Sequence, residues 1–595
     1  MTPIERCTRF FKKPAGAVKT NDTVCFTLGD LPGVKSVSLL LRRDDEQHTA
    51  RMDFERGEQG FALCHVFDTA GLYFYAFQTD DGRWLQGLSE AGAVFGADPM
   101  WAQQTVVCSS YEPADSFFGG IAYQIFPDRF AIGGILRKLP GRRYHESRDE
   151  QPVWQPDADG EVRNLDFFGG DFMGIRQKLP YLRSLGVTLI YLNPIFEARS
   201  NHRYDTGDYL KIDPQLGTEA DFTALCAEAK QLGIRIILDG VFSHTGDDSR
   251  YFNRYGRYDT LGAYQSEESP YRSWFKFRRW PDDFSSWWGV KTLPEVNEED
   301  PSYVEFICGE GGVIEHWMKA GASGFRLDVA DELPDSFIEK IRAAVRRCDK
   351  QGLLIGEVWE DASNKISYNT RRKYFWGREL DGTVNYPFRN AVLEFIRSAD
   401  AHSFEGAVQE ILLHYPAEML CSCLNMLSSH DTARAINALA APDALAKPRS
   451  EQAVRTLSLD EYLRGVEMLK LAYALVYMLP GIPMVYYGDE IGMQGYGDPF
   501  CRGFFNWAGG DEILLSAMRR LGGERTRYKD ALCGAEMEFF HVGNGAVGFY
   551  RGSGYDRVAF LLNRSEQPVT VALDNGETIT AAPWQYTLQE AVKED

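Results

Sequence analysis

The chain has 595 residues and a formal net charge of -21, from 64 Lys and Arg residues against 85 Asp and Glu residues. This length is too great for one hydrophobic core and predicts roughly two to four domains. The negative charge repels phosphate backbones and anionic lipid headgroups. It therefore argues against nucleic acid or a membrane as a partner and is compatible with a neutral ligand.

The N-terminal segment MTPIERCTRFFKK carries charge, but no apolar stretch follows it, so no secretory signal is predicted. The most apolar stretch, residues 469–488, contains a lysine and two prolines and is not a clean membrane span. The 11 cysteines are an odd number without a CxxC pair, and Cys421 and Cys423 have the spacing of alternating strand positions. We therefore expect reduced thiols and a cytoplasmic protein.

Residues 1–112 predict a small N-terminal β-sandwich. The runs TVCFTLGD, SVSLLLRR, FALCHVF and YFYAFQT are rich in β-branched and aromatic residues, and turn sequences such as DLPG and DDG separate them. Short strands between frequent turns are typical of packed antiparallel sheets.

Residues 113–530 predict an α/β domain, a (β/α)8 TIM barrel. Apolar strand candidates alternate here with amphipathic helices such as EADFTALCAEAKQLG. Continuous apolar runs indicate strands that are buried on both faces, as in a parallel barrel. The strand candidates are residues 121–126, 187–193, 234–239, 323–328, 353–357, 382–386, 424–429 and 482–487.

Two further regions belong to neither the barrel nor the first sandwich. Residues 245–308 follow the third strand and are too many for a plain connection, so they predict an inserted subdomain at the rim. Residues 531–595 contain the runs MEFFHV, AVGFYRG, RVAFLLN and VTVAL. They predict a C-terminal β-sandwich.

Polar side chains follow several of the predicted barrel strands, at the point where each strand ends. In barrels of this kind, function sits at the carboxyl ends of the strands. One aspartate at such a position is commonly a helix N-cap, but capping does not explain polar residues at the ends of several strands. The residues are Asp239, His244, Arg326, Asp328, Glu357, His430 and Asp431.

These residue types suit the cleavage of a glycosidic bond with retained configuration. That reaction needs an ionised carboxylate and a protonated carboxyl roughly 5–5.5 Å apart. Arg326 lies two residues before Asp328, on the same strand face, where its charge would keep Asp328 ionised. Glu357 follows LLIG and precedes Val358 and Trp359. We expect this apolar environment to raise its pKa and keep it protonated.

Eight motifs resemble those of the α-amylase superfamily of glycoside hydrolases, in particular its neopullulanase, cyclomaltodextrinase and amylopullulanase group. The motifs occur in the family's order and span roughly residues 120 to 510. They are YQIFPDRF, NPIFEARSNHRYDTGDY, DGVFSHTG, LPEVNEED, GFRLDVADE, IGEVWED, SSHDTAR and GIPMVYYGDEIGM.

The resemblance implies Asp328 as nucleophile, Glu357 as acid/base and Asp431 as the stabiliser of the transition state. It also implies Tyr204 as a stacking platform beneath the sugar at the cleaved bond. The remaining substrate-binding residues that we infer are Asp239, His244, Arg326, His430, Asp498, Arg502, Trp359 and His202.

Some roles remain open at this point. His202 either lines the site or fixes its loop. Trp274, Trp287 and Trp288 are either sugar platforms or packing residues of the inserted subdomain. Tyr209 is interpreted as structural.

Two departures from the family bear on calcium. The family often has a calcium-binding Asn where this chain has Ser243, and relatives carry an Asn- and Asp-rich loop after PDRF. Here that loop reads AIGGILRKLPGRR, which lacks the hard oxygen ligands that Ca²⁺ requires. Asp171 alone does not make a site. We therefore predict that no metal or other cofactor is required.

The segment LPEVN is close to the MPKLN-like version of the neopullulanase group. With an N-terminal sandwich, this favours cleavage of α-1,4 bonds in maltodextrins, starch, cyclodextrins or pullulan. Whether α-1,6 bonds are also cleaved stays open at this point. A 4-α-glucanotransferase, an isomerase of small disaccharides and a non-catalytic glucan-binding protein are the alternatives. The sandwich itself is open to three roles: binding glucan, walling the cleft, or forming a homodimer.

Overall fold

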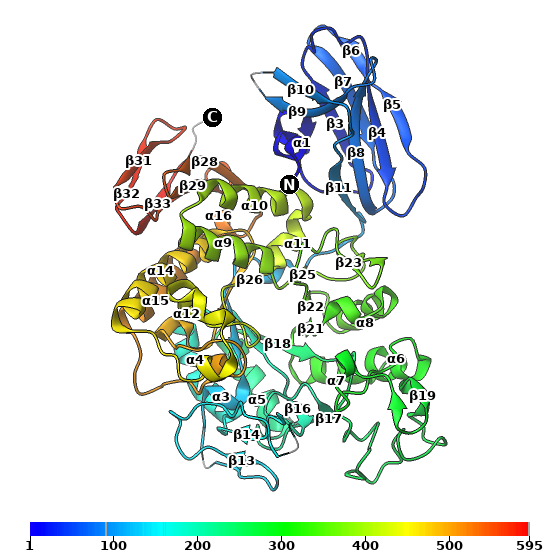
Figure 1. Cartoon of the computed structure of the whole chain (residues 1–595), viewed down its shortest axis with the longest axis vertical. Helices are drawn as coiled ribbons and strands as arrows, with labels where there is room; N and C mark the ends of the chain where they lie inside the picture. The colour runs from blue at the N-terminus through cyan, green and yellow to red at the C-terminus, as the bar shows by residue number, and fades with distance from the viewer. Residues whose placement is uncertain (90–91, 135, 159, 161, 593–595) are drawn as a thin grey trace.

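An eight-stranded parallel sheet, closed into a barrel, forms the centre of the computed structural model (Figure 1). The structure describes residues 1–89, 92–134, 136–158, 160 and 162–592. In spatial order the strands are β25 (Gly382–Thr383), β22 (Leu353–Gly356), β21 (Gly324–Leu327), β18 (Arg235–Gly240), β15 (Leu189–Leu192), β12 (Ala122–Ile125), β27 (Ile482–Tyr486) and β26 (Leu424–Met426). A parallel bridge between Val384 and Leu424 joins the first to the last. Each strand lies in one of the predicted runs, except that β18 extends one residue beyond its run, so the barrel is confirmed.

Both faces of these strands are buried, which explains their continuous apolar sequence. Leu189 and Tyr191 of β15 belong to the core inside the barrel. Ile190 and Leu192, which alternate with them, belong to the core between the strands and the surrounding helices. The alternation follows from the two-residue period of a strand.

Helices cover the outside of the barrel. They include α4 (Phe172–Ser184), α5 (Glu219–Gln231), α6 (Pro301–Cys308), α7 (Val313–Ala320), α8 (Asp335–Cys348), α9 (Tyr386–Ser398), α10 (Ala401–His414), α14 (Leu459–Met478) and α15 (Glu512–Arg527). Local sequence sets their starts: Thr218 and Asp221 form a capping box at the start of α5. None of the helices in the described part of the chain has the length and apolar character needed to cross a membrane.

The N-terminal region contains two sheets, which lie at one end of the long axis of the molecule (Figure 1). One sheet has the order β1-β3-β7-β6, and the other has the order β10-β9-β8-β11-β2, with β4 attached to β8 and β5 attached to β4. The short strands among these are β1 (Lys12–Lys13), β2 (Val18–Lys19), β5 (Ala50–Asp53), β6 (Glu55–Gly57), β9 (Trp84–Ser89) and β10 (Gly92–Gly96). The predicted runs become β3 (Thr23–Leu28), β4 (Val37–Arg43), β7 (Gly60–Val66) and β8 (Gly71–Thr79). Two short helices that the sequence pattern did not predict, α1 (Pro3–Arg6) and α2 (Thr8–Phe11), precede them. The last strand is β11 (Ala102–Val107).

The expectation that every cysteine is a reduced thiol is wrong for one pair. Cys25 on β3 and Cys64 on β7 are directly opposite in the antiparallel register and form a disulfide. The interpretation of Cys421 and Cys423 as alternating strand residues is also wrong. Cys421 lies in the helix α11 (Ala417–Ser422), and Cys423 follows that helix.

The region after β18 holds little regular structure beyond β19 (Phe277–Arg279) and β20 (Asp283–Phe284). The helix α6, which the predicted insert includes, packs against α7 and α8 of the barrel's helical layer. At the C-terminus, β28 (Met537–Gly543), β29 (Ala546–Arg551), β30 (Val558–Asn563) and β33 (Gln585–Glu590) form one sheet. The strands β31 (Val569–Ala572) and β32 (Thr578–Ala581) form a second sheet.

Candidate active site

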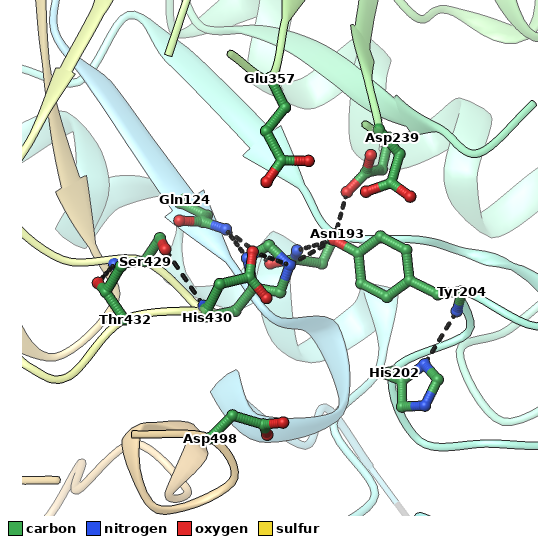
Figure 2. Close-up of polar contacts among 12 residues, drawn as sticks. Gln124, Asn193, His202, Tyr204, Asp239, Glu357, Ser429, His430, Thr432 and Asp498 are labelled. Carbon is green, nitrogen blue, oxygen red and sulfur yellow. Dashed lines mark hydrogen bonds and ion pairs between the residues drawn. The ribbon is translucent and has the colours of Figure 1, made fainter. Parts of the chain in front are cut away.

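A cavity of about 850 Å³ lies at the carboxyl ends of the barrel strands. It brings together ten of the twelve predicted site residues: His202, Tyr204, His244, Asp328, Glu357, Trp359, His430, Asp431, Asp498 and Arg502. The other two, Asp239 and Arg326, lie beneath its floor and contact these residues. Figure 2 shows Glu357, Asp239, Tyr204, His430 and Asp498 around one common space.

Arg326 is the centre of the acidic group at the floor. Its Nη1 lies 2.7 Å from Asp239 Oδ1 and 2.8 Å from Asp328 Oδ1, and its Nη2 lies 2.8 Å from Glu357 Oε2. The expected contact between Arg326 and Asp328 is present. The expected apolar environment of Glu357 is wrong, because this carboxylate also accepts hydrogen bonds from the Val329 N–H and the Trp359 indole. The strand ends bring more donors together than the flanking sequence suggests.

The protonation of this group follows from burial and from its charge balance. Burial raises the pKa of Asp328 well above its usual range; Arg326 opposes this, and the carboxylates of Glu357 and Asp239 add to it. Three carboxylates share one guanidinium, so the group holds a proton more readily than separate carboxyls would. The site can therefore present an ionised carboxylate and a protonated carboxyl at the same time.

A chain of hydrogen bonds crosses the floor from β12 to β18 (Figure 2). Gln124 donates from Nε2 to Asn193 Oδ1 at 3.0 Å and to His430 Nδ1 at 2.9 Å. The Tyr204 hydroxyl accepts from Asn193 Nδ2 at 3.0 Å and donates to Asp239 Oδ2 at 2.7 Å. His430 Nε2 also contacts this hydroxyl. The chain fixes the ring of Tyr204 at the cavity wall.

His430 is neutral. Burial lowers its pKa well below its usual range, and the charges of Arg502 and Arg326 lower it further. Because Nδ1 accepts from Gln124, its proton is on Nε2, which faces Tyr204 and, at 3.2 Å, Asp431 Oδ2. The imidazole is thus a fixed hydrogen-bond donor at the cavity floor.

The two other predicted histidines differ in what holds them. His202 Nδ1 accepts from the Tyr204 N–H at 3.1 Å and contacts Ser200 Oγ at 3.0 Å, so this residue both lines the cavity and fixes its loop. Burial, aided by Arg502, lowers its pKa to about 3. His244 contacts Ser243 Oγ through Nδ1, and burial lowers its pKa to about 3. Both rings are neutral polar contacts.

Arg502 organises the opposite side of the cavity. Its Nη1 pairs with Asp498 Oδ1 at 2.8 Å, and its Nη2 lies 3.4 Å from Asp431 Oδ1. Burial raises the pKa of Asp431, and Arg502 opposes this shift. These three charges therefore form a fixed group in the lining of the cavity that also contains Asp328.

The aromatic residues divide into wall and packing residues. Trp359 stacks on Tyr386 with ring centroids 4.2 Å apart and stays about half exposed. Trp287 and Trp288 line the cavity. Trp274 is buried among aromatic rings of the insert and therefore packs it. Tyr209 is fully buried and donates to the Val241 carbonyl, in keeping with a structural role.

Sequence reasoning missed several residues at the site. Gln124 is the last but one residue of β12 and Asn193 directly follows β15, inside the motifs YQIFPDRF and NPIFEARSNHRYDTGDY, and that position was the available signal. Glu332 and Tyr368 also line the cavity. Glu332 ends the motif GFRLDVADE, which was the available signal, whereas no sequence pattern marks Tyr368. Tyr191 donates to Asp239 from a fully apolar run.

The residues considered for calcium are engaged in local hydrogen bonds. Asp171 Oδ1 caps α4 by accepting from the Gly174 N–H and also accepts from the Gly133 N–H. Ser243 Oγ contacts His244. Ile135, in the loop that follows PDRF, lies outside the described residues.

Comparisons with known proteins identify the family of this chain. The alpha amylase catalytic domain model matches residues 124–512. An amylopullulanase of Thermoanaerobacter thermohydrosulfuricus is 33% identical over 577 residues, which cover 86% of this chain and 38% of that protein. Neopullulanase 2 of Thermoactinomyces vulgaris is 34% identical over 460 residues, which cover 76% of this chain and 65% of that protein. The chain thus spans less than two thirds of each relative.

A solved structure gives the same fold. The cyclic α-maltosyl-(1→6)-maltose hydrolase of Arthrobacter globiformis has a TM-score of 0.67 and 29% identity, over 80% of this chain and 100% of that one. The family match covers more than half of the chain and includes every strand of the barrel except the start of β12. The chain belongs to the α-amylase family.

Proposed function

We propose that this protein is a retaining α-glucan hydrolase that works through a covalent glucosyl-enzyme intermediate. The observation that carries this proposal is the pairing of Asp328 and Glu357 with the single guanidinium of Arg326 at the cavity floor. Two carboxyl groups beside one cation can hold one proton between them, which is the protonation that a retaining mechanism needs.

In the first step Asp328 attacks the anomeric carbon and the glycosidic C–O bond breaks. Glu357 gives its proton to the departing oxygen, so the leaving sugar departs as an alcohol. The product is a β-linked ester between the sugar and Asp328. In the second step Glu357 takes a proton from water, whose oxygen attacks the anomeric carbon and releases Asp328. Two inversions restore the α configuration.

The surrounding residues stabilise the oxocarbenium-like transition state and hold the ring. Asp431 supplies negative charge opposite Asp328, and Arg502 keeps its carboxylate in place. The neutral His430 donates from Nε2, and the fixed ring of Tyr204 offers a face for the sugar. These groups need not move as the transition state forms, because hydrogen bonds and ion pairs already hold them in place.

The substrate class follows from the family and from the insert. We propose α-1,4 bonds of maltodextrins, starch, pullulan or cyclodextrins as targets, with α-1,6 bonds as an addition. The segment LPEVN and relatives named neopullulanase and amylopullulanase support this class. No metal or cofactor enters the mechanism.

Product analysis tests this function. Incubation with starch, pullulan, β-cyclodextrin and maltotriose should release shorter sugars, seen by chromatography, and NMR should show α-configured products first. First products in the β configuration would refute retention, and no turnover of any substrate would refute the hydrolase. Longer products in the presence of a good acceptor would indicate a glucanotransferase instead, and a single product of unchanged mass would indicate an isomerase.

We also predict that calcium is not required. Asp171 is engaged as the cap of α4, and Ser243 offers no amide oxygen. Exhaustive chelation should leave hydrolysis of maltotriose essentially unchanged. A large loss that added calcium restores would contradict this prediction.

A further inference from the structure

The connection from β22 to β25, residues 357–381, contains no α-helix, and the structure describes all of it. Every other barrel strand is followed by at least one helix before the next strand. Its regular structure is the hairpin of β23 (Ile366–Ser367) and β24 (Thr370–Arg371), which pair over two residues each. A hairpin of this size is marginally stable alone. Its position must therefore come from the elements that contact it.

Residues 359–371 of this connection, called here the wall segment, form one side of the cavity. Six of them line it: Trp359, Glu360, Lys365, Ile366, Ser367 and Tyr368. The side chains of Ile366 and Tyr368 are more than half exposed. On the barrel side the segment is held by Lys365, whose Nζ lies 3.0 Å from Asp331, and by Ser367, which donates to the Asp331 carbonyl.

On the other side the N-terminal sandwich holds the wall segment through Gln103 of β11. The buried amide of Gln103 donates to Ser363 Oγ at 2.7 Å and accepts from Asn364 Nδ2 at 2.8 Å. The amide nitrogen and the amide oxygen of Gln103 thus both form hydrogen bonds with the wall segment. A buried amide satisfied at both ends fixes the relative position of the two elements it joins.

A second contact runs through His414 at the end of α10. His414 Nδ1 lies 2.7 Å from Asp361 of the wall segment, and Nε2 lies 3.4 Å from Glu5 of the sandwich. Its backbone carbonyl accepts from Thr105 Oγ1 at 2.7 Å. Asp361 in turn accepts from the N–H of Ser363 at 2.9 Å.

His414 and Glu5 are both charged near neutral pH. Burial lowers the pKa of His414, but its hydrogen bonds to Asp361 and Glu5 outweigh this and raise it to about 9. Burial raises the pKa of Glu5, but His414 outweighs this and the pKa falls to about 2. Glu410, paired with the amino group of Met1, also faces this group.

A third contact joins the hairpin itself to the sandwich. Arg371 of β24 pairs with Asp44 through Nε at 2.7 Å and Nη2 at 3.3 Å. The chain that leaves β11 also crosses the same connection, where the Cys108 N–H donates to the Trp376 carbonyl at 3.0 Å. Figure 1 shows β23 beside the N-terminal sandwich, between it and α8.

We infer that the N-terminal sandwich positions the wall segment in the same chain, with Gln103 and Asp44 as the positioning residues, and thereby sets how the cleft binds long glucans. This inference rests on the proposed function. The wall segment begins two residues after Glu357, the group that protonates the leaving sugar, so the wall faces the leaving-group side of the cleft. Substrates with a sugar on that side should depend on the sandwich, and substrates without one should not.

The test compares maltohexaose with α-maltosyl fluoride, whose leaving group is a single fluorine atom. In Gln103→Ala and in Asp44→Asn, KM for maltohexaose should rise roughly five- to tenfold, as expected for the loss of about one hydrogen bond. The kcat on maltohexaose and the kcat/KM on the fluoride should both change by less than about twofold, because Asp328 and Glu357 are not moved. The melting temperature of each variant is recorded alongside.

Three further variants sharpen the test. Asn364→Ala should raise KM by no more than Gln103→Ala does, and the double variant should cost no more than Gln103→Ala alone, because that change already removes the contact to Asn364. Gln78→Ala is the matched control, since the side chain of Gln78 on β8 contacts only Arg51 of the sandwich among the side-chain hydrogen bonds of the described residues.

Equal losses on both substrates, or an unchanged KM for maltohexaose in both positioning variants, would overturn the inference. If Gln103→Ala does not fold, the partly exposed Asp44 carries the test. A wild-type protein that turns over neither substrate would refute the proposed function itself, which is a different result.

Discussion

Replacing Glu357 by Gln should lower kcat on maltohexaose by roughly 10²- to 10⁴-fold, the usual contribution of a general acid. The amide keeps the size of the side chain and can still accept from the Val329 N–H and Arg326, so the fold and substrate binding should change little. It has no proton to give to the departing oxygen. Steady-state kinetics on maltohexaose and α-maltosyl fluoride measures the effect.

The fluoride separates the acid role from other losses. Fluoride departs without strong protonation, so formation of the ester from α-maltosyl fluoride should be affected far less than cleavage of maltohexaose. Glu394→Gln is a matched control on α9, where the exposed carboxylate pairs only with Arg397 among the described contacts. An unchanged kcat on maltohexaose in Glu357→Gln would move the acid role to another residue.

Replacing Asp328 by Asn should abolish turnover of both substrates, by about 10⁴-fold or more, the scale seen when a catalytic nucleophile or its partner is removed. An amide does not form the glycosyl ester, and a better leaving group does not restore it. This loss on the fluoride distinguishes Asp328 from Glu357.

Asp328→Asn should not lower the melting temperature. It removes one of three carboxylates that crowd Arg326, while Asp239 and Glu357 remain paired with the guanidinium. Asp349→Asn, at an exposed turn, is the control and should keep full activity. Residual turnover of the fluoride near the wild-type rate would remove the nucleophile role from Asp328.

The raised pKa of Asp328 predicts how activity falls at low pH. Burial raises its pKa well above the usual range for an aspartate, and the protonated form lacks the charge for attack. In the wild type, kcat/KM should therefore fall, as pH decreases, at a pH above the ordinary aspartate pKa of about 4. A profile that stays flat below that value would contradict this expectation.

The environment of Glu357 shows where flanking sequence misleads. Its flanking residues, LLIG and Val-Trp, are apolar, and the sequence therefore predicted an apolar environment. In the fold, Arg326 from the neighbouring strand β21 reaches the same carboxylate that Val329 and Trp359 contact. Which strands are neighbours is a property of the sheet, and flanking residues do not encode it.

The sequence by itself determined the eight strands, the order of the domains along the chain and the residues at the strand ends. These features are local: apolar periodicity fixes each strand, and carboxyl ends of parallel strands must meet at one edge. Only the tertiary structure decided that Arg326 serves three carboxylates, that His430 carries its proton on Nε2, and that Gln103 of the sandwich contacts the wall segment. Each of these depends on groups that are far apart along the chain, whose distance and burial set the charge and the position of a side chain.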